Sequence, residues 1–227
     1  MKAYLEPSEV RLLEEAAPCV RDELLIRILF RTGIRVSEAL GLAVEDIDLK
    51  QGALTILHLK VRLNLACPDC NVRLAKSAVF CPGCGIKVDT PQLKETEHRR
   101  VRTIPLDRDT LVRLRKYIAP GGFKEKNGRH LLFAITSTRA WQVVRECAEK
   151  ANLGDLVNPE TGKPRHVSPH RLRDAFAVMA VQRDDSTDGV RMLQEQLGHA
   201  SIGTTMRYRK ISGKELRDWY GKLWEKE

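Results

Sequence analysis

The sequence predicts a mainly helical fold that contains a small antiparallel β-sheet. Apolar residues recur at helical spacing in most segments, and hydrophobic residues make up 42% of the 227 residues, enough for a substantial core. Two segments, residues 53–59 and 100–105, have the short or alternating pattern of strands instead. A cysteine-rich stretch separates them, so we expect an inserted module at the tip of a β-hairpin.

The first 50 residues are predicted to form helices. Pro7 and Ser8 open the first, and residues 20–30 form a second, mostly buried helix. Gly33 is a suitable C-terminal stop for the second helix. A short helix at residues 37–42 then precedes the first strand.

Helices and loops alternate after the second strand. Asp107 is placed to cap a helix that ends near Ile118, and another helix is predicted at residues 138–151. Proline, glycine and asparagine mark loops at residues 120–122, 127–128 and 154–167.

Three helices are predicted in the last quarter of the chain. Ser168, as the N-cap, and Pro169, at the first helical position, begin one of them. A second, at residues 189–197, stops at Gly198, and the third, at residues 212–226, begins with a capping-box pattern.

The charge balance favours a polyanionic partner. Lysine and arginine total 39 against 30 acidic residues, which gives a net charge of +9 and a pI near 9.4. Nucleic acid is the simplest such partner, although a basic protein can also be merely soluble. No apolar run is long enough for a membrane span and the start has no secretory apolar segment, so we expect a cytoplasmic protein.

Four of the six cysteines form two CPxC pairs, Cys67 with Cys70 and Cys81 with Cys84. Each CxxC turn can place two thiolates on one ion, and tetrahedral zinc takes four such ligands. Because the protein supplies all four, the site has no open position for catalysis and is predicted to be structural. This module could contact the DNA backbone or a partner subunit, or make no contact at all.

Three further segments carry a specific signature. They are TGIRVSEALGL at residues 32–42, SPHRLR at residues 168–173 and LGHASIGTTMRY at residues 197–208. In this order they resemble the signature of the tyrosine recombinases, the family of lambda-type integrases and Xer recombinases. The resemblance begins near residue 7, runs to the end of the chain and omits only the cysteine segment.

The resemblance implies a role for five residues. Arg35 and Arg173 match the family's two phosphate-binding arginines, and His170 and His199 match its two histidines. Tyr208, nine residues after His199, matches the nucleophile that attacks the scissile phosphate to give a 3′-phosphotyrosyl intermediate. Taken singly, each could instead be a surface arginine, a helix-end histidine or a packing tyrosine.

The chemistry of a phosphodiester suits these residue types. Two permanently charged guanidinium groups can each bind its non-bridging oxygens bidentately, and the helix beginning at Ser168 adds amide dipoles. Strand exchange and religation then conserve the bond energy, so the resemblance implies neither ATP nor a divalent metal. The family also uses a hairpin lysine as general acid, and Lys60 and Lys94 are both candidates.

The resemblance also implies a domain organisation. Residues 1–62 and 91–227 would form the recombinase catalytic domain, and residues 63–90 an inserted zinc ribbon. The family's N-terminal core-binding domain is not found, so the chain is either truncated or a minimal enzyme. Asp174 follows Arg173 where many relatives have histidine, a departure that removes no catalytic residue.

Double-stranded DNA is the partner that the resemblance implies, in the nucleoid of a cell that hosts a mobile element. The helix at residues 212–226 would join protomers into a tetramer on DNA, or fold back on its own core. Two other functions remain open: a type IB topoisomerase-like enzyme that nicks and reseals DNA, and a non-catalytic DNA-binding module. The intact set of five residues argues against the second.

Overall fold

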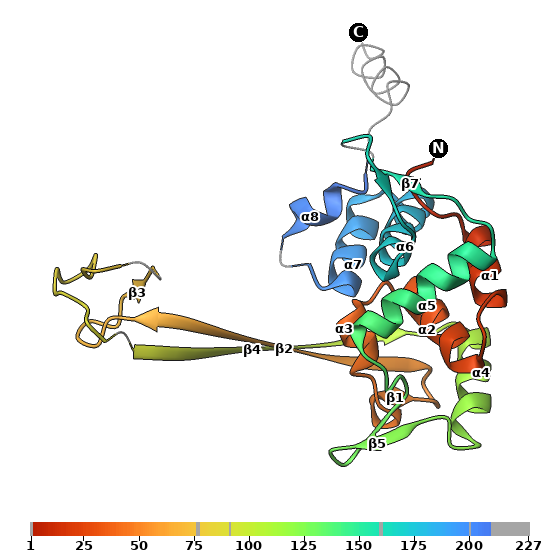
Figure 1. The fold of residues 1–227 in the computed structure, drawn as a ribbon, viewed down its shortest axis with the longest axis horizontal. Coiled ribbons are helices and arrows are strands. Elements are labelled where there is room, and N and C mark those ends of the chain that lie inside the picture. The colour runs from red at the N-terminus through yellow and green to blue at the C-terminus, as the bar shows by residue number, and fades with distance from the viewer. Residues whose placement is uncertain (1, 76–77, 91, 159–160, 200, 210–227) are drawn as a thin grey trace, which may run out of the picture. The chain divides into compact units, whose positions relative to one another are not determined.

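The computed structural model describes residues 2–75, 78–90, 92–158, 161–199 and 201–209 (Figure 1). Its helices are α1 (Pro7–Glu15), α2 (Val20–Thr32), α3 (Val36–Leu40), α4 (Arg108–Ile118), α5 (Ser137–Lys150), α6 (Pro169–Arg183), α7 (Thr187–Leu197) and α8 (Ile202–Met206), with a 3-10 turn η1 (Val44–Asp46). Its strands are β1 (Ile47–Asp48), β2 (Ala53–Ala66), β3 (Arg73–Leu74), β4 (Gln92–Pro105), β5 (Lys124–Lys126), β6 (Arg129–Leu131), β7 (Leu156–Val157) and β8 (Pro164–Arg165). The predicted class, mainly helical with small antiparallel sheets, is confirmed.

The chain divides into two compact units. Leu57–Val101 forms the smaller one, and the segments on either side of it form the larger one. Strand β2 pairs with β4 and, in antiparallel fashion, with β1 and β3. None of the helices in the described part of the chain is long and apolar enough to cross a membrane.

Helix α2 is the centre of the larger unit. It packs against α1, α3, α4, α5 and α6. Because neighbours surround it, its apolar residues face inward on every side: Leu24, Leu25, Ile26, Ile28 and Leu29 are all fully buried. Burial on this scale is the main stabilising term of such a domain and fixes where the two ends of α2 lie.

The ends of the helices largely follow the predicted signals. Gly33 ends α2 with φ +65°, and an added Cβ would lie 2.4 Å from Phe176, so both conformation and space require glycine. The Asp107 side chain accepts a hydrogen bond from the backbone N–H of Thr110, as predicted. Ser168 is the N-cap residue of α6 and Pro169 begins the helix, as predicted, although the buried Ser168 side chain makes no capping hydrogen bond.

The β-structure is more extensive than predicted. Strands β2 and β4 run well beyond residues 53–59 and 100–105, toward the cysteine segment. Residues 127–128, predicted as a loop, form the turn of a hairpin between β5 and β6. Asn127 and Gly128 both have positive φ, the geometry that an Asn-Gly hairpin turn requires. Residues 154–167 also contain a short ladder, β7 with β8.

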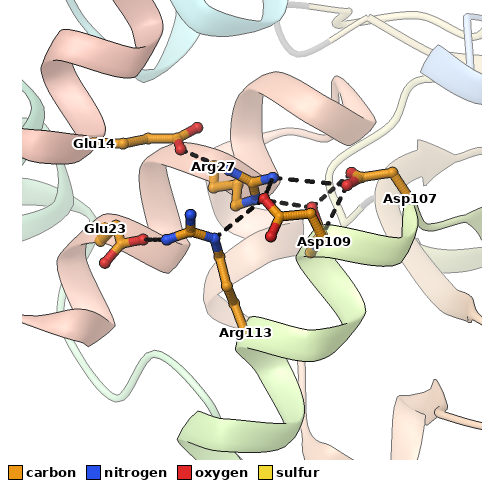
Figure 2. Close-up of polar contacts among 7 residues, drawn as sticks. Glu14, Glu23, Arg27, Asp107, Asp109 and Arg113 are labelled. Carbon is orange, nitrogen blue, oxygen red and sulfur yellow. Dashed lines mark hydrogen bonds and ion pairs between the residues drawn. The ribbon is translucent and has the colours of Figure 1, made fainter.

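A buried ion network joins α1, α2 and α4 (Figure 2). Arg27 is only 3% exposed, and it donates to Glu14 Oε2 at 2.7 Å and to Thr110 Oγ1 at 2.9 Å, and also pairs with Asp109. Burial raises the pKa of Glu14, more than the neighbouring charge of Arg27 lowers it. Removing Arg27 would therefore leave a buried carboxyl without its cation.

We expect Arg27→Met to destabilise the protein by about 3–5 kcal/mol, because one partner of a buried pair is removed while the others remain. Urea unfolding followed by circular dichroism measures the change. Lys116→Met, at an exposed position on α4 outside the network, serves as the control and should shift the unfolding free energy by less than about 0.5 kcal/mol. Equal stability of the two variants would show that the Arg27 network contributes nothing specific.

Candidate active site and metal centre

The five residues singled out by the three segments line one cleft of about 680 Å³ in the larger unit. The cleft is strongly cationic, with a single carboxylate, that of Asp174, among its lining residues. The basic lining side chains are Arg35, Arg165, Arg171, Arg173, Arg207, His170 and His199. Such a concentration of guanidinium groups around a concave surface attracts an anion with several oxygens, such as a phosphodiester.

Arg173 lies at the base of this cleft and is 3% exposed. It donates to the carbonyl oxygen of Gly33, at the end of α2, and to that of Leu197, at 2.8 Å, at the end of α7. Helix C-termini leave such carbonyls without internal partners, so one guanidinium satisfies two helix ends at once. Burial lowers the pKa of Arg173 to about 10, which still leaves it charged at neutral pH.

His199 is held by both ring nitrogens. Arg173 Nη2 lies 3.0 Å from Nε2, and Thr205 Oγ1 lies 2.9 Å from Nδ1. Because arginine can only donate, Nε2 accepts, and the ring proton therefore sits on Nδ1 and is donated to Thr205. Burial, with the adjacent positive charge of Arg173, lowers the pKa of His199 to about 4, so its ring is neutral at physiological pH.

Arg35 approaches the cleft from the turn before α3, with 38% of its side chain exposed. The carboxylate of Glu38 accepts from the Arg35 backbone N–H at 2.8 Å and from its Nη1 at 3.2 Å. Burial alone would raise the pKa of Glu38, but hydrogen bonds from Arg102 and Arg35 hold it below its ordinary value. The ionised Glu38 thus fixes Arg35 while the guanidinium stays accessible.

Arg102, on β4, connects the elements that carry the site. It binds Glu38 bidentately, at 3.1 and 2.7 Å, and its Nε donates to the carbonyl oxygen of Gln196 on α7 at 3.1 Å. Its guanidinium lies against Gly198, where an added Cβ would meet Nη1 at 2.8 Å. No role for Arg102 was predicted from the sequence. The available signal was its strand position two residues before the buried Ile104, which puts both side chains on the inward face.

Tyr208 follows α8, and its hydroxyl donates to Asp174 Oδ1 at 2.9 Å. Its ring stacks on that of His199, with centroids 6.4 Å apart and planes within 13°. Burial and the negative charge of Asp174 raise the pKa of Tyr208, so the phenol is protonated at neutral pH. In the sequence, Asp174 is distinguished only as a departure from the family pattern, and this contact was not predicted.

His170 lies in the first turn of α6 with 63% of its side chain exposed, and it lines the cleft. The two candidate lysines lie on the hairpin strands, Lys60 in β2 and Lys94 in β4, within the smaller unit. Their side chains fall outside the described part of the structure, so the general acid stays a prediction. The segment 212–226 also lies outside the described residues.

The four cysteines of the CPxC pairs cluster in the smaller unit. Their sulfur atoms all lie within 4.8 Å of one another, with Cys67 to Cys84 at 3.6 Å and Cys70 to Cys81 at 3.4 Å. Four thiolates around a tetrahedral zinc ion at the usual bond length lie about 3.8 Å apart. The cluster therefore has the size and the ligand set of a four-thiolate metal site.

The two CPxC turns have matching backbone geometry. In the first, the Cys67 N–H donates to the Val72 carbonyl and the Asn71 N–H donates to the Cys67 carbonyl. The second repeats this pattern at Cys81, with Ile86 and Gly85 in the corresponding positions. Asn71 and Gly85 both have positive φ. This repetition places each sulfur pair in the same orientation and supports a metal-binding design.

Comparison with known proteins assigns the fold. The crystal structure of XerA recombinase superposes with a TM-score of 0.62 at 20% identity, covering 100% of this chain and 67% of that one. The catalytic domain of bacteriophage HP1 integrase gives a TM-score of 0.53 at 17% identity and covers 97% and 95% of the two chains. At such low identities the likeness concerns the fold alone.

Curated relatives point to the same family. Tyrosine recombinase XerA of Pyrococcus furiosus is 27% identical over 94% of this chain and 59% of its own length. Tyrosine recombinase XerD of Bifidobacterium longum is 31% identical over 92% of this chain and 58% of its own. The chain thus spans somewhat more than half the length of these recombinases. Its residues 3–215 match the phage integrase family, and the chain therefore belongs to this family of tyrosine recombinases.

Proposed function

We propose that this chain is the catalytic part of a site-specific DNA recombinase, or integrase, and that Tyr208 is its nucleophile. The observation that carries the proposal is the convergence of Arg35, Arg173, His199 and Tyr208 on one cationic cleft. These residues come from four different elements, and the cleft is their common feature. Family membership supports the proposed reaction class, and the geometry supports the role that we propose for each residue.

Arg35 and Arg173 would bind the scissile phosphate. Arg173 is fixed by two helix-end carbonyls, so it is held in place before substrate arrives. Arg35 is accessible and aligned by Glu38. Donors that are preorganised in this way stabilise the charge that builds on the phosphate oxygens during attack, without reorganising at that moment. His170, at the rim, would add a further contact to the same anion.

The cleavage step forms one bond and breaks another. Tyr208 Oη bonds to phosphorus, the bond from phosphorus to the 5′ oxygen breaks, and the DNA 3′ end is left on the enzyme. Lys60 or Lys94 would protonate the leaving 5′ oxygen. The phosphotyrosyl ester keeps the bond energy for religation to a new strand, so the step uses neither ATP nor a divalent metal.

Double-stranded DNA is the proposed partner. The net charge of +9 and the arginine-rich cleft support it. A structurally similar recombinase, XerH, is described as bound to its difH substrate, and the Tn1549 transposon integrase as bound to transposon right-end DNA. We further propose that protomers assemble on DNA as a tetramer through residues 212–226, in the cytoplasm where the nucleoid lies.

For the cysteine cluster we propose a structural zinc ion. The four sulfur atoms supply a complete tetrahedral set, which leaves no open position for a substrate or water. The buried side chains beside them, Leu74 among them, form only a small apolar cluster. A metal would therefore supply much of the folding energy of the smaller unit.

Covalent trapping tests the proposed nucleophile. Labelled suicide DNA substrates from the sequences flanking the gene are incubated without metal with wild type and with Tyr208→Phe, then run on a denaturing protein gel. We expect a shifted protein–DNA band with wild type and none with the variant, because phenylalanine has no attacking oxygen. Tyr117→Phe, away from the cleft, is the matched control and should retain the band. A band of equal intensity with Tyr208→Phe would exclude Tyr208 as the nucleophile.

Metal analysis tests the zinc site. We expect one zinc ion per chain in wild type and a loss of zinc in Cys81→Ser, because a hydroxyl is a far poorer zinc ligand than a thiolate. Cys19→Ser, at an exposed cysteine outside the cluster, should keep its zinc. Wild-type protein without metal, with all four clustered thiols open to titration, would contradict the proposal.

A further inference from the structure

Asp174 occupies a position in the cleft that phosphate binding does not explain. It follows Arg173 on α6, is 6% exposed and lines an otherwise cationic cavity. A buried carboxylate at this place repels a phosphate, so its presence calls for another role. The direct contact is with the nucleophile, because the Tyr208 hydroxyl donates to Asp174 Oδ1 at 2.9 Å.

The rest of the carboxylate is held in place by its neighbours. Arg171 Nη1 lies 2.7 Å from Oδ2, and His170 Nε2 lies 3.9 Å from Oδ1. The Arg171 contact uses the oxygen that Tyr208 does not, so the carboxylate is oriented with Oδ1 directed at the phenol. Arg173 and Tyr4 also act electrostatically on Tyr208, and Asp174 acts on His199. The other cations nearby, Arg35, Arg102 and Arg165, act on the neighbouring Arg173, His199 and His170.

The phenol has to lose its proton during the attack. Burial and the charge of Asp174 raise the pKa of Tyr208, so no appreciable phenolate exists beforehand at neutral pH. His199 is poorly placed as the acceptor, because its two ring nitrogens are engaged by Arg173 and Thr205 and its ring lies stacked on that of Tyr208. His170 Nε2 lies 3.9 Å from Asp174 Oδ1, the oxygen that accepts the hydrogen bond from Tyr208, so the carboxylate is the group in direct contact with the phenol.

We propose that Asp174 is the general base of strand cleavage, taking the proton of Tyr208 as Oη attacks phosphorus; this inference rests on the proposed recombinase function. The Oη–phosphorus bond forms as the O–H proton moves to Asp174 Oδ1, while the 5′ oxygen leaves with a proton from the hairpin lysine. In religation the attacking 5′ hydroxyl returns its proton to that lysine, and Asp174 returns its own to the departing tyrosine oxygen. Protons and electrons therefore balance over the cycle without an external acid or base.

Single-turnover cleavage of the suicide substrate tests this role with Asp174→Asn and Asp174→Glu. Asparagine keeps the size and an oxygen acceptor but cannot hold the proton, so we expect cleavage to slow by about 10²–10⁴-fold although DNA affinity is not reduced. Between about pH 6 and 9 the rate of Asp174→Asn should rise roughly tenfold per pH unit, more steeply than that of wild type, because hydroxide replaces the missing base. Glutamate should restore part of the rate.

A substrate with sulfur in place of the 5′ bridging oxygen distinguishes the two proton transfers, from Tyr208 to Asp174 and from the hairpin lysine to the leaving oxygen. Thiolate leaves without protonation, so this substrate should rescue the variant that lacks the hairpin lysine and leave Asp174→Asn slow. Rescue of Asp174→Asn to the wild-type rate would overturn the proposal. A purely structural role would instead lower the rate equally at every pH, and a latch that restrains Tyr208 would make Asp174→Asn faster than wild type; either result overturns it.

Titration of the Tyr208 phenol without DNA provides a readout independent of cleavage. Removing the carboxylate charge in Asp174→Asn should move the titration of this phenol to lower pH, and an unchanged titration would contradict the contact itself. Failure of wild type to form any adduct would refute the recombinase function. A fully active Asp174→Asn enzyme, with wild-type cleavage intact, would refute the general base alone.

Discussion

The buried guanidinium of Arg173 holds the candidate active site together. Its donors bind the end of α2 and, in a segment far from it in the sequence, the end of α7 and one nitrogen of His199. Each helix end would otherwise leave a buried carbonyl without a donor, which costs about 1–3 kcal/mol per group. The same contacts that satisfy the backbone therefore bring the three signature segments to one cleft. The Arg173 side chain thus both satisfies the helix-end carbonyls and forms part of the candidate active site.

A second set of buried ionic contacts, centred on Glu38, joins the elements that carry the candidate active site. Glu38 accepts hydrogen bonds from Arg35 and Arg102. Arg102 also donates to the carbonyl oxygen of Gln196, three residues before His199. These contacts thus link α3, β4 and α7 beside the cleft that Arg35 and Arg173 line. Tyr208 lies in a short turn after α8, where its backbone N–H donates to the carbonyl oxygen of Thr205, its hydroxyl donates to Asp174 and its ring stacks on His199. The cations of the cleft are therefore fixed by buried contacts to several elements, whereas Tyr208, the proposed nucleophile, lies at the end of a short helix.

Features that depend on residues close together in the sequence could be predicted from it. Helix ends at Gly33 and Gly198, the cap at Asp107 and the two CPxC turns all depend on residues within a few positions of one another. The hairpin at Asn127 and Gly128 was also encoded locally, but the dipeptide was read as a loop. The resemblance also placed Arg35, His170, Arg173, His199 and Tyr208 at one site, but two contacts between distant residues were missed. Arg102 meets Glu38 across 64 positions, and Asp174 meets Tyr208 across 34, separations about which periodicity and capping carry no information.

The most direct test of the account is the single-turnover cleavage rate of Arg173→Lys. Lysine keeps the positive charge, but it cannot span two carbonyls and a histidine nitrogen with a planar fork of donors. The account predicts that cleavage falls by about 10²–10³-fold while DNA binding and overall folding are largely kept, because positioning is lost rather than charge. A variant that cleaves at the wild-type rate would show that charge alone is enough, and would contradict the organising role of this guanidinium.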